Sequence, residues 1–184
     1  MSLTETPICN FGEKAKNFNL LSIERKNVSL KDIKGEKGTV IMFICNHCPY
    51  VKAVINNIVS DVNYLKTIGI KSVAIMSNDV KNYPEDSFEN MESFSKKHLF
   101  TFPYLIDDTQ LVAKKYGAVC TPDFFGYNKN LELQYRGRIR ALNKLKPIEN
   151  GESDLVKAMT LVAKTGKGPI KQIPSMGCNI KWFK

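Results

Sequence analysis

The sequence has no run of eighteen apolar residues, so it lacks a segment long enough to cross a bilayer as a helix. Its N-terminus, Met1 to Pro7, also lacks the basic stretch and apolar core of a secretory signal. We therefore expect a cytoplasmic protein that does not associate with membranes. Thiols are kept reduced in the cytoplasm, so a Cys-x-x-Cys pair there indicates catalysis or metal binding before a structural disulfide.

Acidic residues are scarce relative to basic ones, 18 against 27, which gives a net charge of +9. A nucleic-acid interface needs basic residues that cluster. Here the lysines are scattered, and their runs do not exceed pairs such as Lys96-Lys97 and Lys114-Lys115. The charge therefore favours an ordinary solvated surface over a nucleic-acid partner.

Internal repeats are absent, and the composition, with 43% hydrophobic and 24% charged residues, is that of an ordinary globular protein. A chain of 184 residues is long enough to bury one hydrophobic core. We predict a single thioredoxin-like domain over residues 1–184 that ends in an irregular tail over residues 165–184. The residues that support this fold are described next.

The first half of the chain predicts a β-α-β unit. Thr39 to Ile44 is a continuous apolar run, as expected of a buried central strand, and it ends at the motif Cys45-Asn46-His47-Cys48. Apolar residues then recur at three- and four-residue spacing from Val51 to Leu65, which predicts an amphipathic helix. Ile70 to Met76 predicts a second buried strand. The two cysteines therefore lie at the N-terminus of the first helix.

The second half predicts more helices and an antiparallel hairpin. The predicted elements are, in order, a helix opened by Pro84, a strand over 104–106, a helix stopped by Gly117, a hairpin over 123–138 and a helix over 155–162. We interpret the region before Thr121-Pro122 as a helical insertion. The order βαβ followed by ββα predicts an α/β fold with one central mixed sheet flanked by helices.

Two cysteines separated by two residues at the start of a helix suit thiol-disulfide exchange. The helix N-terminus stabilises a thiolate, which predicts a lowered pKa for Cys45. We therefore predict that Cys45 attacks and Cys48 resolves the mixed disulfide, with no cofactor and no metal. The imidazole of His47 is expected to stabilise the ionised, reduced form and so to raise the reduction potential.

The chain resembles the thioredoxin superfamily, and most closely the peroxiredoxin-like branch related to alkyl hydroperoxide reductase and thiol-specific antioxidant (AhpC/TSA) proteins. The resemblance covers about residues 15–165. It is carried by Cys45 to Val51, by Ser77-Asn78-Asp79 with Tyr83-Pro84-Glu85-Asp86, and by Cys120-Thr121-Pro122-Asp123. It implies a thioredoxin-like fold in which Pro122 is a cis-proline facing the cysteines, with Thr121 and Pro122 as substrate-binding residues.

The sequence departs from both parent patterns. Peroxiredoxins carry a Thr three residues before the reactive Cys-Pro pair and an Arg near the cis-proline, and here Cys45 and Thr121 stand in these places. Thioredoxins carry an aromatic residue before the first cysteine and a buried Asp in the preceding strand, where this chain has Ile44 and Thr39. The Thr and Arg that activate peroxide in peroxiredoxins and the Asp that relays protons in thioredoxins are therefore all replaced.

Three functions fit the motif. The first is a thiol-disulfide oxidoreductase or thiol-dependent antioxidant protein, which acts on a protein disulfide or dithiol and needs a thiol electron donor. The second is a thiol peroxidase that reduces hydroperoxides through a sulfenic acid. The third, from another class, is a chaperone that holds copper or zinc between Cys45 and Cys48, although a second cysteine pair is missing. The sequence leaves open whether the chain forms a homodimer.

Three further cysteines lie outside the motif. Cys120 is either an accessory thiol beside the active site or a small buried side chain. Cys178 is either a resolving thiol carried by a mobile tail or, as we favour, an inert tail cysteine. We expect Cys9 to be incidental.

The remaining polar candidates are three arginines and one histidine. Arg136, Arg138 and Arg140 alternate in sequence, so we expect one shared face, which grips an anion or, as we favour, protects an exposed strand edge. We expect His98 to be a surface residue at a helix end.

Overall fold

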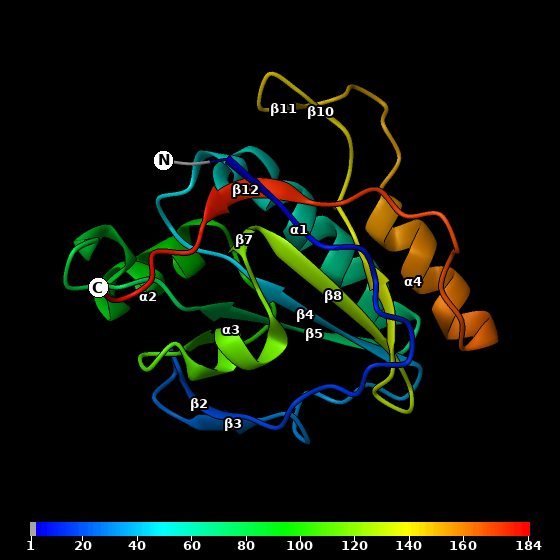
Figure 1. Cartoon of the computed structure of the whole chain (residues 1–184), viewed down its shortest axis with the longest axis horizontal. Coiled ribbons are helices and arrows are strands. Elements are labelled where there is room, and N and C mark those ends of the chain that lie inside the picture. The colour runs from blue at the N-terminus through cyan, green and yellow to red at the C-terminus, as the bar shows by residue number, and fades with distance from the viewer. Residues whose placement is uncertain (1–2) are drawn as a thin grey trace.

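The computed structural model describes residues 3–184, so the first two residues of the predicted domain lie outside it. A seven-stranded mixed sheet lies at its centre, with helices on both faces (Figure 1). In spatial order the strands are β3 (Asn27–Ser29), β2 (Asn19–Ser22), β6 (Tyr104–Ile106), β5 (Ile70–Met76), β4 (Gly38–Phe43), β8 (Asp123–Asn128) and β9 (Leu133–Arg136). Within this range the helices are α1 (Pro49–Thr67), η1 (Pro84–Asp86, a 3-10 turn), α2 (Phe88–Lys97), α3 (Leu111–Tyr116) and α4 (Asp154–Thr165). The predicted fold class is confirmed.

The predicted β-α-β unit forms the middle of the sheet. Every residue of β4 is buried, and β4 pairs in parallel with β5 and antiparallel with β8. Helix α1 connects β4 to β5 and begins at Pro49, a residue that suits the first helical position because it has no N–H group to leave unpaired. The cysteine motif therefore forms the connection between β4 and α1.

Alternate residues of β4 enter two different cores. Val40 and Met42 pack into a core on the side of α1 and α4, while Ile41 and Phe43 pack into a core on the side of α3. This alternation follows from the two-residue repeat of a strand and explains why the run reads as continuously apolar.

Among residues 3–184, no helix is long and apolar enough to cross a membrane.

The second-half predictions are confirmed in their main elements. β8 and β9 form the antiparallel hairpin, and its turn is held by the Asn128 side chain, which accepts hydrogen bonds from the backbone N–H groups of Asn130 and Glu132. Gly166 ends α4 in the left-handed conformation. The region before Pro122 also supplies a strand to the main sheet, because β6 pairs with β5 on one side and β2 on the other.

The tail predicted to be irregular contains a strand, which corrects that prediction. β12 (Met176–Asn179) lies between β1 (Leu3–Glu5) and β7 (Cys120–Thr121) in a second, three-stranded sheet. Figure 1 shows the two ends of the chain, in blue and red, side by side there. The strand is only four residues long, and both of its partners are distant in sequence, so no local pattern predicts it. Cys178 is consequently buried in a strand, not carried by a mobile tail.

Candidate active site

The motif Cys45-Asn46-His47-Cys48 lies where β4 gives way to α1. Cys48 is the N-cap residue of α1, and Cys45 lies two residues beyond the end of β4. Both cysteines are buried, with 1% and 0% of their surfaces exposed. The His47 side chain is 15% exposed and is the most accessible part of the motif.

The strand that precedes the cis-proline supplies contacts to both sulfur atoms. The peptide bond between Thr121 and Pro122 is cis, as the resemblance implied. The Thr121 hydroxyl lies 3.4 Å from the Cys45 sulfur, and its carbonyl oxygen lies 3.1 Å from the Cys48 sulfur. The structure therefore brings together the motif and the predicted substrate-binding residue.

The two motif thiols share a proton, so the pKa of one cysteine is lowered while that of the other is raised. A hydrogen bond from the Cys45 thiol lowers the pKa of Cys48, and bonds from the Thr121 side chain, the Val51 backbone and Cys178 act in the same direction against the effect of burial. The same shared proton raises the pKa of Cys45, and burial and the negative charge of Asp86 raise it further. This distribution differs from the sequence-based prediction of a low pKa at Cys45. Cys48, the N-cap residue, is one turn closer to the helix N–H groups.

The proton shared by Cys45 and Cys48 can reside on either sulfur. As a thiol, Cys48 donates to the Thr121 carbonyl oxygen, and as a thiolate it accepts from Cys45. Cys45 has the Thr121 hydroxyl as its own partner. Both protonation states of the pair are therefore hydrogen-bonded, which a buried polar group requires.

Asp86 of η1 holds the motif through hydrogen bonds to its backbone and to His47. This fully buried carboxylate accepts a hydrogen bond from His47 Nδ1 at 2.7 Å and one from the Asn46 backbone N–H at 2.8 Å. It also accepts from the Asn78 side chain at 2.8 Å. The hydrogen bond to Asp86 raises the pKa of His47, whereas partial burial opposes that change. The Tyr83 ring stacks parallel to the imidazole at 5.7 Å.

Asp86 and Tyr104 are two residues of the site that the sequence did not predict. Asp86 ends the segment Tyr83-Pro84-Glu85-Asp86, which is part of the family resemblance. An acidic residue in a segment shared with the family was the one sequence feature that could have indicated its role. Tyr104 is fully buried and donates its hydroxyl proton to the Asn46 side chain at 2.9 Å. Thr39, at the place of the thioredoxin acid, accepts from the Gly35 backbone instead. The buried carboxylate near the thiols thus comes from η1.

The remaining cysteines differ in their relation to the motif. The Cys178 thiol is hydrogen-bonded to Cys48. Cys120 is fully buried, its thiol donates to the Pro122 carbonyl oxygen, and burial raises its pKa. Burial also raises the pKa of Cys9 to about 11. Only Cys178 among these three therefore makes a hydrogen bond to a motif cysteine within the described residues.

The three arginines are each paired with an aspartate, and β9 ends at Arg136, so the expected shared strand face is wrong. The pairs are Arg136 with Asp123 at 3.0 Å, Arg138 with Asp154 at 2.6 Å and Arg140 with Asp61 at 3.2 Å. Arg136 is buried and also lies over the Phe125 ring. Their partners come from distant segments, which alternation in sequence does not reveal. His98 does lie at the end of α2, where it contacts Phe94.

Two hollows adjoin the motif from different sides. One, of about 550 Å³, is lined by His47, Asn46 and residues of α2, and His98 and Lys97 lie on its wall. The other, of about 350 Å³, is lined by Pro122 and Tyr50, the residue that follows Cys48-Pro49. The first hollow borders His47 and Asn46 directly, and the second lies beside the cis-proline.

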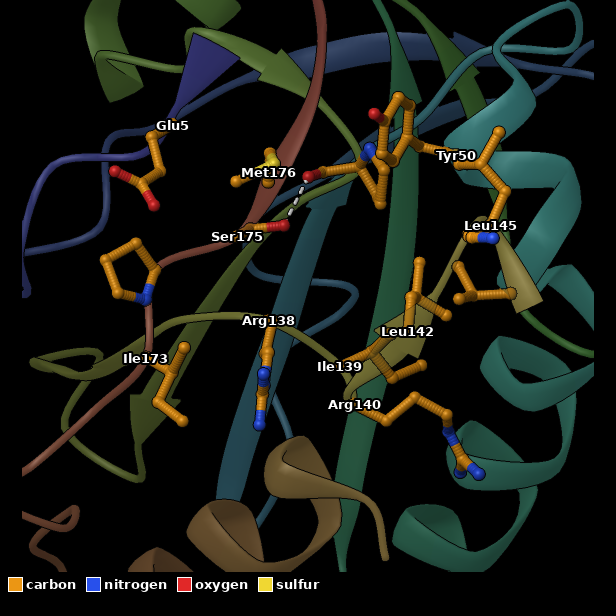
Figure 2. A pocket seen from close by; sticks show the side chains of 14 residues that line it. Glu5, Tyr50, Arg138, Ile139, Arg140, Leu142, Leu145, Ile173, Ser175 and Met176 are labelled. Carbon is orange, nitrogen blue, oxygen red and sulfur yellow. Dashed lines mark hydrogen bonds between the residues drawn. The ribbon is translucent and has the colours of Figure 1, made fainter. Parts of the chain in front are cut away.

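Figure 2 shows the second hollow from close by. Ser175 and Met176 line one side, and the Ser175 hydroxyl donates to the Pro122 carbonyl oxygen at 2.7 Å. Leu142 and Leu145 line the opposite side. Glu5, Arg138 and Arg140 also line this hollow, so it combines apolar and charged side chains.

The site also contains a set of potential metal ligands. Cys45, His47 and Asp86 each offer one ligand atom, and these atoms lie within 4.8 Å of one another. Thiolate and imidazole are ligands that zinc and copper accept. His47 would have to give up its hydrogen bond to Asp86 if it bound a metal through Nδ1.

Comparisons with solved structures find two similar proteins along the whole chain. An uncharacterized conserved protein from Geobacillus kaustophilus is 40% identical, with a TM-score of 0.90 over 100% of this chain and 97% of that chain. A hypothetical protein from Sinorhizobium meliloti 1021 is 33% identical, with a TM-score of 0.90 over 99% of both chains. No curated protein sequence matches at a significant level.

A more distant structure shares the fold. The thioredoxin domain of a thiol-disulfide oxidoreductase from Bacteroides vulgatus is 16% identical, with a TM-score of 0.58 over 68% of this chain and 86% of that domain. This likeness confirms the predicted thioredoxin-like fold. The sequence model of the AhpC/TSA family matches residues 11–142, which is most of the chain, so the chain belongs to the AhpC/TSA family.

Proposed function

We propose that this protein is a thiol-disulfide oxidoreductase in which Cys45 and Cys48 cycle between a dithiol and a disulfide. The observation that carries the proposal is the placement of both thiols at the start of α1, each in contact with Thr121 beside the cis-proline. Membership of the AhpC/TSA family supports a redox role.

The proposed reaction starts from the thiolate at Cys48. Cys48 attacks one sulfur of a disulfide substrate, a Cys48–substrate bond forms, and the substrate disulfide breaks to release one thiolate. Cys45 then loses its proton and attacks the Cys48 sulfur, which releases the second substrate sulfur and leaves the Cys45–Cys48 disulfide. Substrate is reduced by two electrons as the protein is oxidised by two. This order reverses the roles that the sequence analysis gave the two cysteines, because the thiolate-stabilising contacts lie on Cys48.

His47 and Asp86 supply the proton acceptor for the second step. A ring nitrogen of His47 and an oxygen of Asp86 lie within 4.8 Å of the Cys45 sulfur. Asp86 holds Nδ1 of His47 and stabilises the imidazolium that forms when the Cys45 proton is taken up. We therefore assign His47 as the base and Asp86 as its positioning residue.

The test of the proposal is a redox equilibrium. Stabilising the ionised, reduced form raises a reduction potential, so we expect a value above the roughly −270 mV of thioredoxin and toward the roughly −180 mV of protein disulfide isomerase. The measurement is equilibration with glutathione followed by separation of oxidised and reduced protein. His47→Ala should lower the potential, and His98→Ala, a change of the same kind at the end of α2, should not. An unchanged potential in His47→Ala would contradict the stabilisation of the ionised, reduced form by His47.

Thiol peroxidase activity is the alternative within the same family. It is favoured by the thiolate-stabilising contacts at Cys48, because Cys48-Pro49 matches the reactive Cys-Pro pair of peroxiredoxins. The family's Thr and Arg are replaced by Cys45 and Thr121, which favours disulfide exchange. Peroxide consumption by the pre-reduced protein separates the two functions. A second-order rate far above that of a free thiol at equal thiolate concentration would establish the peroxidase.

Metal binding is the alternative from another class, and the ligand atoms of Cys45, His47 and Asp86 favour it. Metal analysis of protein purified without chelator tests it, with Cys45→Ser as the comparison. Stoichiometric copper or zinc that is lost in the variant would establish a metal-binding protein. A cytoplasmic location and a thiol electron donor stay predictions.

A further inference from the structure

The C-terminal strand β12 fills the edge of β7 beside the cis-proline. Cys178 pairs with Thr121 and Asn179 with Cys120, in antiparallel register. The ladder continues with a hydrogen bond from the Ile180 N–H to the Val119 carbonyl. The family resemblance implies that Thr121 and Pro122 bind the substrate, and an extended peptide would pair with this edge of β7. In this protein the chain's own strand occupies it.

Gly177 allows β12 to lie unusually close to the cis-proline. A Cβ atom at this position would lie 2.1 Å from the Thr121 carbonyl oxygen, well inside any tolerated contact. The neighbouring residue Ser175 adds its hydrogen bond to the Pro122 carbonyl oxygen. The strand is therefore fitted to the surface around Thr121 and Pro122.

The strand is fixed on both sides of Cys178. Before it, the Ser175 carbonyl accepts from the Thr6 N–H. After it, the backbone of Lys181 donates to the Asn78 side chain at 2.9 Å and accepts from the Gln110 side chain at 2.7 Å. Cys178 thus has a defined position in the folded protein, with only 4% of its surface exposed.

This position places three sulfur atoms in sequence. Thr121, whose carbonyl oxygen lies 3.1 Å from the Cys48 sulfur, pairs with Cys178 of β12, and Cys45 and Cys178 both act on the pKa of Cys48. Cys48 is therefore the central sulfur, with a potential disulfide partner on each side. Cys120 lies in the same sheet, but its thiol points to the Pro122 carbonyl oxygen.

We propose that Cys178 is a third redox residue, which takes over the disulfide of Cys48 from Cys45. The step rests on the proposed function, because it starts from the Cys45–Cys48 disulfide. The Cys178 thiolate attacks the Cys48 sulfur, the Cys48–Cys178 bond forms, and the Cys45–Cys48 bond breaks. Cys45 leaves as a thiolate and takes up the proton that Cys178 has lost, so no electrons enter or leave the protein.

In this exchange Cys178 of β12 takes the place of a substrate cysteine. Its cysteine approaches Cys48 from the strand edge where the cysteine of an extended partner peptide would lie. The oxidised protein therefore has two disulfide isomers that share Cys48, and the second isomer frees the Cys45 thiol.

Disulfide mapping of Cys45→Ser tests the inference. The reduced variant is treated with glutathione disulfide, quenched with acid, digested and examined by mass spectrometry. Cys48 first forms a mixed disulfide with glutathione, and Cys178 then displaces the glutathione, so we expect a Cys48–Cys178 bond in most molecules. Cys45→Ser/Cys178→Ser should stop at the glutathione adduct. Cys45→Ser/Cys120→Ser, a matched loss of a buried cysteine, should still form the bond.

The outcomes separate this inference from the proposed function. An adduct that persists on Cys48 in folded Cys45→Ser, while the wild type forms its Cys45–Cys48 disulfide, overturns the role of Cys178 and leaves the proposed function standing. A wild type that forms neither disulfide contradicts the proposed function itself. If Cys45→Ser does not fold, as judged by circular dichroism, the time course of the wild type decides. Growth of the Cys48–Cys178 bond at the expense of Cys45–Cys48 supports the exchange, and its absence at all times contradicts it.

Discussion

The buried carboxylate of Asp86 accepts a hydrogen bond from His47 Nδ1 at 2.7 Å and so joins the 3-10 turn η1 to the cysteine motif. The same carboxylate accepts from the backbone N–H groups of Asn46 and His47. A single side chain therefore orients the imidazole and holds the loop that carries it. This arrangement makes Asp86 a positioning residue for the base in the proposed reaction.

Asp86→Asn should lower the pKa of His47. The Asp86 hydrogen bond and charge raise that pKa in the wild type, whereas burial and Lys181 lower it, so removing the carboxylate leaves the lowering effects in place. Titration of His47 by NMR measures the change. Glu85→Gln removes a neighbouring carboxylate that is not bonded to the imidazole and should shift the pKa less. Equal shifts in the two variants would show that the pKa of His47 responds to any nearby negative charge and not to the hydrogen bond with Asp86.

The thiolate at Cys48 should stabilise the reduced protein with rising pH. The pKa of Cys48 is lowered to about 5 from its ordinary value of 9.0, so its contribution to stability is complete above pH 9 and lost as the pH falls to 5. The difference in free energy of unfolding between reduced wild type and Cys48→Ala should therefore grow between pH 5 and 9, by at most about 1.4 kcal/mol per pH unit.

Urea unfolding under reducing conditions, at several pH values, measures this difference. Cys120→Ala serves as control, because burial raises the pKa of Cys120 and keeps its thiol protonated across the same range. A difference for Cys48→Ala that is flat with pH would place the thiolate elsewhere, with Cys45 as the first alternative.

Asp123→Asn should destabilise the fold by about 3–5 kcal/mol, because it leaves the buried Arg136 guanidinium without its counter-charge. Asp154→Asn is the matched control. It breaks the pair with Arg138, in which both side chains are about one-third exposed, and should cost less than about 1 kcal/mol. Denaturant midpoints of both variants measure the effect, and similar losses would contradict the distinction between the two pairs.

Gly177→Ala should loosen β12, because its Cβ atom has no room beside the Thr121 carbonyl oxygen. We expect the buried Cys178 thiol to react faster with a maleimide in the reduced variant than in the wild type. Gly166→Ala provides the control: its positive φ costs roughly 1 kcal/mol, but no atom lies within 4 Å of the added Cβ and β12 is not involved. Equal labelling rates at Cys178 in the two variants would show that general destabilisation, and not the strand contact, exposes the thiol.

The local pattern of the sequence predicts the central fold well. The apolar run before Cys45, the helical spacing from Val51 to Leu65 and the hairpin over 123–138 each depend on neighbours along the chain, and the structure confirms all three. Strand alternation and helix periodicity are local signals, so they suffice for such elements.

The features that complete the site depend on contacts between distant segments. Asp86 reaches the motif from a separate turn, and β12 is a strand only because β1 and β7 lie on its two sides. Periodicity carries no information on such pairings. The position of the thiolate likewise depends on the helix starting at Pro49, which makes Cys48 the N-cap residue.

The central claim is that Cys45 and Cys48 form a reversible redox pair. Equilibration of the wild type with glutathione buffers of defined ratio, followed by disulfide mapping at each ratio, tests it most directly. The account predicts a Cys45–Cys48 disulfide that forms and disappears as a single two-electron couple, at a potential above that of thioredoxin. A protein whose Cys45 and Cys48 remain unlinked at every glutathione ratio would contradict it.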